Sequence, residues 1–291
     1  MASTQKPPIT FRDIQTFDDI QQVENLEREV WKLEDLDVTA VTMLVACKEA
    51  GNIMVGAFDG KDLVGFAFGF LGRENGRFNI HSHMLAVREE YRDHDLGYRL
   101  KLAQRDRTLA MGLREITWTF DPLQSRNAHL NFSKLGVFSN SYRVDFYGPQ
   151  TSSVFFQNGT DRLWVRWPIT SRRVDQRLKN NAARAETLEI LANVSPLVRF
   201  NATGLPDRTD LQEALARQRI AIEIPSDILA IERVDPGLAR EWRLATRWAF
   251  TEALKADFFV AEFCGLVRGR QGPGVYVLQK GQPADYIPEI A

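Results

Sequence analysis

Residues 85–97 have the sequence Leu-Ala-Val-Arg-Glu-Glu-Tyr-Arg-Asp-His-Asp-Leu-Gly. This segment joins the apolar end of a strand to an arginine-led polar loop, and one glycine stands at the start of an amphipathic helix. Such an arrangement directs free backbone N–H groups and the positive end of a helix toward the phosphates of a ligand. The segment therefore predicts a local phosphate-binding site.

The helix after this loop is predicted from the spacing of its apolar residues. Leu96, Leu100, Ala103 and Ala110 fall on one stripe, and Gly112 ends the helix. The polar residues between them are expected to stay in water: Arg99, Lys101, Arg105 and Asp106.

Two strands before the loop are predicted from alternating side chains. In residues 78–87 one face carries Phe78, Ile80, Ser82, Met84 and Ala86, and the other carries Asn79, His81, His83, Leu85 and Val87. In residues 62–71 one face carries Val64, Phe66, Phe68 and Phe70, and the other carries Gly65, Ala67 and Gly69. The small face allows a helix or a ligand to approach the backbone closely.

This loop and its strand resemble the GNAT superfamily of acyl-CoA-dependent N-acyltransferases. The family signature is Arg or Gln, two residues, Gly, one residue, then Gly or Ala, after a strand that ends in a Leu-Ala-Val-like triplet. Here the pattern starts at Arg92 and keeps its last small residue as Gly97. Asp95 stands at the position of the first glycine, so its carboxylate must face solvent.

A second segment resembles the same family in the expected order. Residues 116–123 have the sequence Ile-Thr-Trp-Thr-Phe-Asp-Pro-Leu, and Asn127-Ala128, Phe132 and Leu135-Gly136 follow. They are similar to the family's next strand and the helix that flanks its cofactor. Together with Asn-Ala-His-Leu-Asn at residues 127–131, this sequence motif resembles one bacterial subgroup of the superfamily with poorly defined substrates. The resemblance covers roughly residues 8–168.

The expected fold class is α/β, with a GNAT-like mixed central sheet flanked by helices and an additional small C-terminal α/β unit. We predict a GNAT-like acyl-CoA-binding domain over residues 1–168, a helical linker over 169–196 and the C-terminal unit over 197–291. Within these parts we expect a helix at 125–135, a strand at 141–147, a helix at 171–191 and a helix that begins at Asp235-Pro236. Whether the C-terminal unit extends the first sheet is left open by the pattern.

The resemblance implies which residues hold the acyl-CoA. Main-chain N–H groups of the loop would bind the diphosphate, and a break in strand pairing near Met84 and Leu85 would leave backbone donors for the thioester carbonyl and the pantetheine. The cofactor-binding set is Met84, Leu85, Ala86, Val87, Arg92, Asp93, His94, Asp95, Leu96, Gly97, Tyr98, Asn127 and Phe132.

For the proton of the attacking amine, the candidates are His83 and His81, which face the same way on their strand. Their alternative role is that of buried, hydrogen-bonded strand residues. A metal site is not predicted, because no third ligand with suitable spacing accompanies them. The family's usual general acid is a Tyr four residues before the glycine that ends the helix, and here Phe132 stands at that position. A thiolate leaving group with a pKa near 8.5 departs without much help.

The acceptor is expected to lie near Trp118 and Asp121 at the carboxyl edge of the sheet. Asp121 alternatively caps the turn before Pro122. Removing a proton at pH 7 costs roughly 4.6 kcal/mol for a lysine and about 1–1.4 kcal/mol for an α-amine, so a histidine base favours a small amine. The acyl group is expected to be acetyl, or succinyl if an arginine binds its carboxylate.

Composition excludes several classes of protein. The 291 residues carry a formal net charge of −1, which argues against a nucleic-acid binder driven by bulk charge. No apolar run approaches the ~20 residues that cross a bilayer, and the polar start has no signal-peptide core. Cys47 and Cys264 are expected to be reduced in a cytoplasmic protein. A homodimer is compatible with the sequence. The alternative from another class is a noncatalytic CoA-binding or interaction protein.

Overall fold

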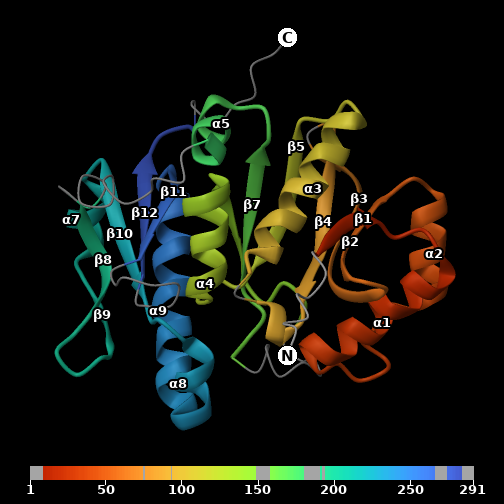
Figure 1. The fold of residues 1–291 in the computed structure, drawn as a ribbon. Helices are drawn as coiled ribbons and strands as arrows, with labels where there is room; N and C mark the ends of the chain where they lie inside the picture. The colour runs from red at the N-terminus through yellow and green to blue at the C-terminus, as the bar shows by residue number, and fades with distance from the viewer. Residues whose placement is uncertain are drawn as a thin grey trace, which may run out of the picture. The chain divides into compact units, whose positions relative to one another are not determined.

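The computed structural model describes residues 9–74, 76–92, 94–148, 158–179, 191, 194–265 and 274–283. Figure 1 shows the helices and strands of these residues in chain order. The chain divides into two compact units, one formed by Met1–Thr117 with Ser152–Val154 and the other by Trp118–Thr151 with Phe155–Ala291. This division falls inside a strand, whereas the sequence suggested a boundary at residue 168.

The first unit contains five strands and three α-helices in its described residues. In chain order they are β1 (Thr10–Asp13), α1 (Phe17–Trp31), α2 (Val41–Glu49), β2 (Ile53–Asp59), β3 (Asp62–Glu74), β4 (Arg77–Val87), the short 3-10 helix η1 (Glu89–Tyr91), α3 (Leu96–Ala110) and the start of β5 (Glu115–Phe120). The strands β1 to β4 are antiparallel neighbours, and β4 pairs in parallel with β5 at Ile80–Ile116 and His81–Thr117.

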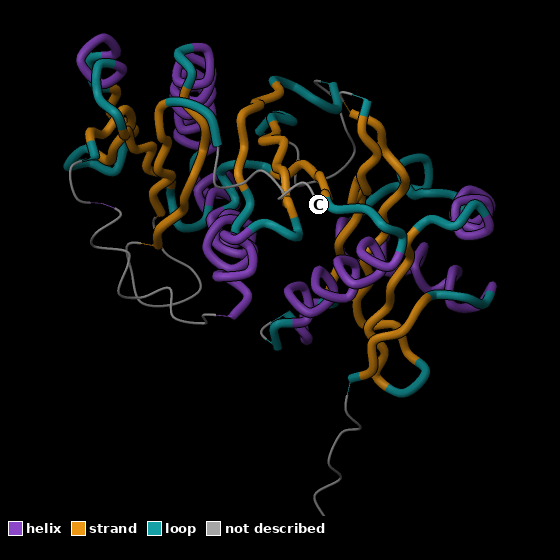
Figure 2. Tube along the Cα trace, turned by 90° about the horizontal axis from the view of Figure 1, so that it is seen from above, coloured by secondary structure: helices purple, strands orange, loops and turns teal. Residues whose placement is uncertain are grey.

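Strand β3 divides the first unit into two layers. Phe66 and Phe68 belong to the apolar core shared with α1 and α2. On the other face, a Cβ added at Gly65 would lie 3.2 Å from Leu100 Cδ1, and one added at Gly69 would lie 2.8 Å from Gln104 Nε2. The small-residue face therefore accommodates α3, one of the two occupants that the sequence allowed. Seen from above, helices lie on both sides of the strands (Figure 2).

The buried stripe of α3 differs from the predicted one. Leu96 and Leu100 are buried as expected, and Gly112 follows the helix end with a φ of 74°. Ala110 is exposed, whereas Lys101 is only 2% exposed although it was expected to stay in water. The glycines of β3 let the helix approach closely, so Lys101, Gln104 and Thr108 are buried as well as Leu96 and Leu100.

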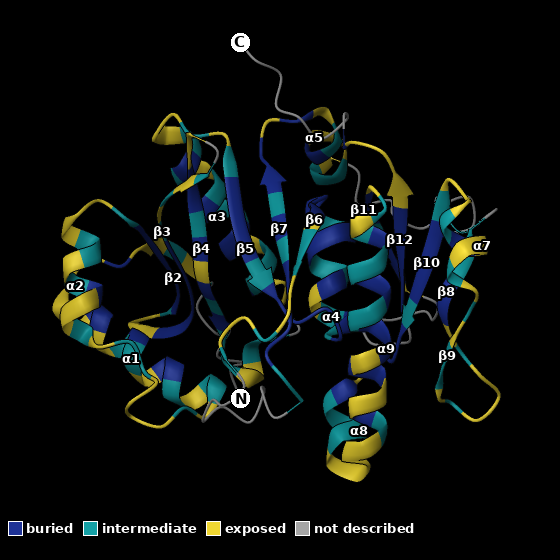
Figure 3. Ribbon diagram, turned by 180° about the vertical axis from the view of Figure 1, so that it is seen from behind, coloured by how far each residue is buried: buried dark blue, intermediate teal, exposed yellow. Residues whose placement is uncertain are grey.

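The second unit continues from the end of β5. It contains α4 (Ser125–Ala128), the π-helical segment η2 (His129–Leu135), β6 (Phe138–Arg143), β7 (Arg162–Pro168), α5 (Arg172–Lys179), β8 (Ser195–Phe200), β9 (Pro206–Arg208), α7 (Leu211–Leu215), β10 (Arg219–Ile224), α8 (Ile228–Val234), α9 (Pro236–Lys255), β11 (Phe258–Gly265) and β12 (Gly274–Lys280). Its strand order is β7-β6-β11-β12-β10-β8-β9. Figure 3 shows the central strands mainly buried.

The C-terminal strands extend an existing sheet, which answers the question that the periodicity left open. β11 pairs with β6 through Val260 and Ser139, so residues of the predicted C-terminal unit share a sheet with residues of the predicted first domain. The helix at 125–135 is confirmed and ends at Gly136 with a φ of 75°. The strand expected at 141–147 instead starts at Phe138.

Helix starts follow their capping residues. Asp235 Oδ1 accepts a hydrogen bond from Leu238 N at 2.9 Å, as predicted for the start of α9. Of the helix expected at 171–191, α5 covers residues 172–179, and most of the remainder lies outside the described residues. Cys47 and Cys264 are free thiols, as predicted. The fold is thus α/β, with a mixed sheet flanked by helices. None of the described helices is both long and apolar enough to cross a membrane.

Candidate functional site

Strand β4 contains a β-bulge at His83. Phe68 of β3 pairs with Met84, and the next residue, Gly69, pairs with Ser82, so His83 is the extra residue of β4. A bulge disrupts the ladder locally and redirects backbone groups. It lies two residues before the Leu-Ala-Val triplet at 85–87, near Met84 and Leu85, where the family resemblance implies a break in pairing.

The bulge also reverses the predicted alternation of side chains. Met84 and Ala86 pair with Phe68 and Phe66 and join their core, whereas Ser82 contacts α3 on the opposite face. The prediction that Met84 and Ala86 share a face with Ser82 is therefore wrong. One inserted residue shifts a strand by one position, and each side chain beyond it changes face.

The imidazole of His81 is partly buried beside β5. Its Nδ1 lies 3.1 Å from Thr117 Oγ1, and its ring centroid lies 5.4 Å from that of Phe70. Burial, with smaller contributions from the nearby His83 and Lys101, lowers the pKa of His81 to about 4. At neutral pH this ring is uncharged, but a conjugate acid with so low a pKa makes it a weak base.

His83 lies on the bulge and is an exposed residue, although two aromatic rings cover part of its imidazole. Its ring centroid lies 5.8 Å from that of Phe70 and 6.4 Å from that of Phe68. These neighbours desolvate the ring, which lowers the pKa of His83. Both imidazoles lie against Phe70, so the prediction that they face the same way is confirmed.

The loop after β4 is fastened to its surroundings. Arg88 N donates to Val64 O at 2.9 Å, and Arg88 Nε donates to Glu29 Oε2 at 3.0 Å. Tyr91 Oη donates to Asp59 Oδ2 at 2.6 Å, and Arg92 Nε donates to Val87 O at 3.3 Å. These contacts attach the loop to β2, β3, β4 and α1, so its backbone is held before any ligand arrives.

Asp95 begins α3 in a left-handed conformation, with φ of 54° and ψ of 18°. Its side chain is exposed and makes no capping hydrogen bond to the helix. Aspartate tolerates this conformation better than most residues, which explains how it occupies a position where the family has glycine. The expectation that its carboxylate faces solvent is confirmed.

Space is available beside the N-terminus of α3. A Cβ added at Gly97 would meet one atom within 4 Å, Leu85 Cδ2 at 3.9 Å. Leu96 is buried, Tyr98 is half-buried and His94 is exposed, with His94 N donating to Tyr91 O at 3.4 Å. Asp93 lies outside the described residues.

The predicted substrate residues belong to the second unit. Trp118 is 5% exposed, and its ring packs edge-on against Trp167 with centroids 6.0 Å apart. Both carboxylate oxygens of Asp121 accept hydrogen bonds from Arg243, at 2.8 and 2.7 Å. Asp121 Oδ1 also accepts from Leu123 N at 2.9 Å, which is the turn-capping role that the sequence allowed.

Two further predicted cofactor residues lie in the helical segment after β5. Asn127 is exposed on α4, while Phe132 is fully buried. The ring of Phe132 lies against Phe120 and Tyr276, with centroids 6.3 and 5.7 Å away. Phe132 therefore has an apolar packing role within this unit, where the family usually has a tyrosine.

Buried charge was the feature that the sequence did not reveal. Glu27 is 1% exposed, and burial raises its pKa to about 7. Lys101 is equally buried, and desolvation lowers its pKa to about 7. Glu27 lies on the same helical stripe as Val23 and Leu26, next to predicted core positions, and this was the available signal.

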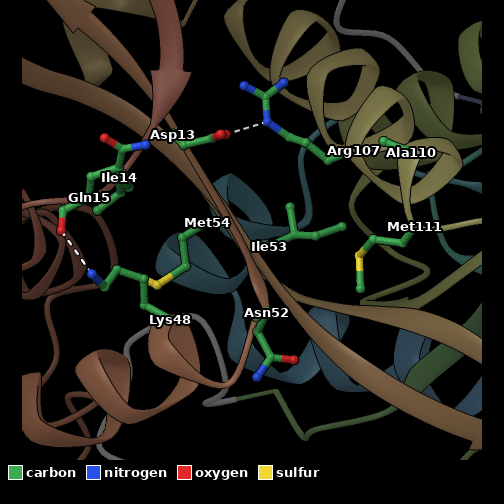
Figure 4. Close-up of a pocket in the computed structure, with 11 residues that line it drawn as sticks. Asp13, Ile14, Gln15, Lys48, Asn52, Ile53, Met54, Arg107, Ala110 and Met111 are labelled. Carbon is green, nitrogen blue, oxygen red and sulfur yellow. Dashed lines mark hydrogen bonds and ion pairs between the residues drawn. The ribbon is translucent and has the colours of Figure 1, made fainter.

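A pocket of about 560 Å³ lies elsewhere in the first unit (Figure 4). Its lining includes Ile53 and Met54 at the start of β2 and Ala110 and Met111 at the C-terminal end of α3. That end of α3 lies roughly 20 Å along the helix axis from the loop. The polar groups on its rim are paired, with Arg107 bonded to Asp13 and Lys48 Nζ bonded to Gln15 O at 3.0 Å.

No protein-family model and no curated protein sequence matches this chain. Among solved structures, the chain is similar to the ribosomal-protein-S18-alanine N-acetyltransferase from Escherichia coli, with 15% identity, a TM-score of 0.45, and coverage of 56% of this chain and 94% of that chain. It is similar to a GNAT superfamily phosphinothricin acetyltransferase from Sinorhizobium meliloti, solved with AcCoA, with 19% identity, a TM-score of 0.44, and coverage of 55% and 88%. A chain of the NatC complex bound to Gag peptide and CoA matches with 16% identity, a TM-score of 0.45, and coverage of 56% and 99%. Acetyltransferases of the GNAT family are thus among its structural neighbours.

Proposed function

We propose that this protein is an N-acyltransferase that moves an acyl group from acyl-CoA to the amine of a small molecule. The observation that carries the proposal is the succession of three features in one unit: the bulge at His83, the hydrogen-bonded loop at 88–92, and the start of α3 at Leu96. Their order matches the motif that the sequence shares with the GNAT superfamily.

The diphosphate of CoA would bind at the loop and the first turn of α3. The first N–H groups of a helix lack internal partners, and the helix dipole adds positive potential there. Gly97 has no Cβ, which leaves its backbone approachable. Arg92, half-buried in the loop, supplies a cationic group nearby.

The thioester would lie beside the bulge, where N–H groups near Met84 and Leu85 serve as donors to its carbonyl oxygen. The amine nitrogen attacks the carbonyl carbon, the C–N bond forms, and the C–S bond breaks with its electron pair going to sulfur. Donors placed at the developing oxyanion typically contribute a few kcal/mol to lowering the barrier. The nitrogen loses one proton to the base, and the CoA thiolate leaves or takes a proton from solvent.

His83 is the proposed base, with His81 as its neighbour. His83 is exposed and lies on the bulge, whereas His81 is partly buried and its Nδ1 contacts Thr117. A histidine acts as a base only when neutral. Because the pKa of His83 is lowered, its basic form persists below the usual value of 6.5.

A second candidate function is that of a noncatalytic CoA-binding or interaction protein with a degenerate site. It is favoured by two departures from the family pattern, Asp95 at the position of a glycine and Phe132 at the position of the usual acid. Acetyl is the proposed acyl group, and succinyl is the alternative. The proposal includes a small amine acceptor, with no nucleic acid and no membrane as partners.

The test combines calorimetry with a turnover assay. The wild-type protein is titrated with acetyl-CoA, succinyl-CoA and CoA, and thiol release is then followed with a panel of amino acids and amines. Binding together with amine-dependent thiol release supports the transferase. Binding without turnover supports the noncatalytic alternative, and the absence of binding contradicts both.

Replacement of His83 by Gln is expected to lower kcat about 100-fold, the usual size of one general base, with little change in the KM for acyl-CoA. The matched control is His81→Gln, for which a smaller loss is expected. In the wild type, activity should fall as the pH drops through the lowered pKa of His83, and this inflection should be absent in His83→Gln. Equal activity of wild type and His83→Gln would remove His83 from the proposal.

A further inference from the structure

A buried polar cluster lies directly behind the bulge, on the α3 face of β4. Lys101 Nζ donates to Ser82 Oγ at 2.7 Å and to Gln104 Oε1 at 3.3 Å. All three side chains are less than 5% exposed. A buried lysine is unfavourable unless hydrogen bonds compensate for its lost hydration, so this cluster needs a reason.

The position of the cluster relative to the bulge supplies that reason. Ser82 is the residue before His83, and Gly69 is the residue of β3 that pairs with Ser82. A Cβ added at Gly69 would lie 2.8 Å from Gln104 Nε2, so the amide of Gln104 packs against the backbone of β3 at the bulge. Lys101 and Gln104 thus hold the two strands at the point where their register shifts.

We propose that Lys101, with Gln104 and Ser82, is a brace that fixes the β4 bulge from the α3 face, and that Lys101 is a positioning residue of the active site. Its contact with Ser82 sets where the following backbone N–H groups lie. For its catalytic consequence this inference rests on the proposed function; the bracing of the bulge does not.

The cluster is also coupled to His81 on the opposite face of the sheet. Burial is the largest cause of the lowered pKa of His81, and the neighbouring His83 and the charge of Lys101 lower it in addition. Of these two neighbouring titratable groups, Lys101 lies on α3 and His83 lies on β4 itself. Lys101 therefore has an effect on His81 that is measurable without any substrate.

The test uses the full chain and three variants. Lys101→Met removes the amine and keeps most of the side-chain length, and Ser82→Ala removes its partner with a smaller change. Thr108→Val is the matched control, because Thr108 is a buried polar residue of the same helix that bonds to Gln104 O within the helix, at 2.9 Å.

Three measurements are made on each variant. Amide hydrogen exchange reports the backbone at residues 83–85, NMR titration reports the pKa of His81, and steady-state kinetics reports the KM for acetyl-CoA separately from kcat. In Lys101→Met we expect faster exchange, an upward shift of the His81 pKa by roughly 0.5 or more, and a KM increase of roughly tenfold. Ser82→Ala should reproduce the faster exchange and the KM increase in weaker form, and Thr108→Val should match the wild type.

Two outcomes have separate meanings. If the wild type shows no acyl transfer, the proposed function fails, while exchange and the His81 titration still decide the brace. If Lys101→Met and Ser82→Ala both match Thr108→Val in exchange at residues 83–85, the brace is wrong whatever the activity. Should Lys101→Met fail to fold, Ser82→Ala alone decides by the same exchange measurement.

Discussion

Asp95 suits the backbone conformation of its loop, but its negative charge opposes the binding of an anion there. Its φ of 54° lies in the region that favours glycine, and its exposed carboxylate stands at the positive end of α3. A negative charge there stabilises the helix modestly, but it would repel the diphosphate that we propose to bind at this loop. The carboxylate of Asp95 therefore stabilises the free protein and destabilises its complex with acyl-CoA.

Asp95→Asn is expected to strengthen acyl-CoA binding about three- to tenfold, because asparagine keeps the left-handed backbone and removes the charge. Calorimetry with acetyl-CoA at low salt measures the change, and added salt should reduce it. Asp106→Asn, the same charge change at an exposed position in the last half of α3, is the control. Unchanged or weaker binding in Asp95→Asn would place the diphosphate away from this loop.

Asp121 and Arg243 form a buried ion pair with two short hydrogen bonds, and their side chains are 10% and 3% exposed. Arg243→Met is expected to cost about 3–5 kcal/mol of unfolding free energy, because it leaves a buried carboxylate without its cation. In Arg243→Met/Asp121→Asn much of this loss should be recovered. Urea denaturation measures both, and Arg240→Met on the exposed side of α9 is the control. If the two substitutions lower the unfolding free energy additively, Asp121 and Arg243 do not stabilise the fold as a pair.

At the scale of elements, the sequence predicts what depends on periodicity and turn chemistry. The helix at 125–135 and the start of α9 follow from apolar spacing and from Asp235, and both are found. The bulge at His83 does not follow from alternation, because one inserted residue leaves the composition of a strand unchanged. For that reason Met84 and Ala86 were assigned to the wrong face.

The burial of charged side chains is the second feature that the pattern hides. Lys101 has the long flexible side chain of a surface residue, and only the closeness of α3 to the glycines of β3 buries it. The candidate loop, in contrast, is predictable from its motif, since Asp95 and Gly97 have local roles in the backbone. Long-range contacts such as Asp121 with Arg243 join residues 122 positions apart, which no local pattern encodes.

Helix α1 carries a carboxyl whose protonation affects stability. Glu27 Oε2 accepts from Thr39 N at 2.9 Å, its Oε1 has no hydrogen-bond partner in the described structure, and its pKa is raised to about 7. Between the ordinary value of 4.5 and about 7 the folded protein holds one more proton at this site than the unfolded chain. The free energy of unfolding therefore falls as the pH rises through this window, by up to about 3 kcal/mol.

Glu27→Gln removes this titration. The stability of the variant relative to the wild type is expected to increase from pH 5 to pH 8. The reason is that the wild type must bury a charged carboxylate at the higher pH, whereas glutamine carries no charge. Chemical denaturation at the two pH values measures the change. Glu34→Gln in the exposed loop after α1 is the control, and a pH-independent difference between Glu27→Gln and wild type would contradict the buried titration.

At the scale of the whole molecule, the second unit depends on residues from distant parts of the chain. β6 pairs with β11, Ser133 Oγ donates to Phe263 O at 2.6 Å, and Arg247 bonds to Asp161. The π-helical segment at 129–135 therefore packs against strands that follow it by more than 100 residues. A family resemblance that ends near residue 168 does not mark the end of the structural unit.

A fragment of residues 1–168 consequently tests the predicted domain boundary. The cut removes Tyr276, which packs against Phe132, and Phe263, which bonds to Ser133. It also removes β11, a strand partner of β6, and it leaves the buried Asp161 without Arg247. An uncovered strand edge and a buried carboxylate without its cation are both unfavourable. We expect the fragment to aggregate or to unfold without a cooperative transition, while the full chain in the same buffer melts sharply. Thermal denaturation followed by circular dichroism measures both. A sharp transition in the fragment, with acetyl-CoA binding equal to that of the full chain, would establish the boundary at 168 and make the contacts between β6 and β11 dispensable for folding.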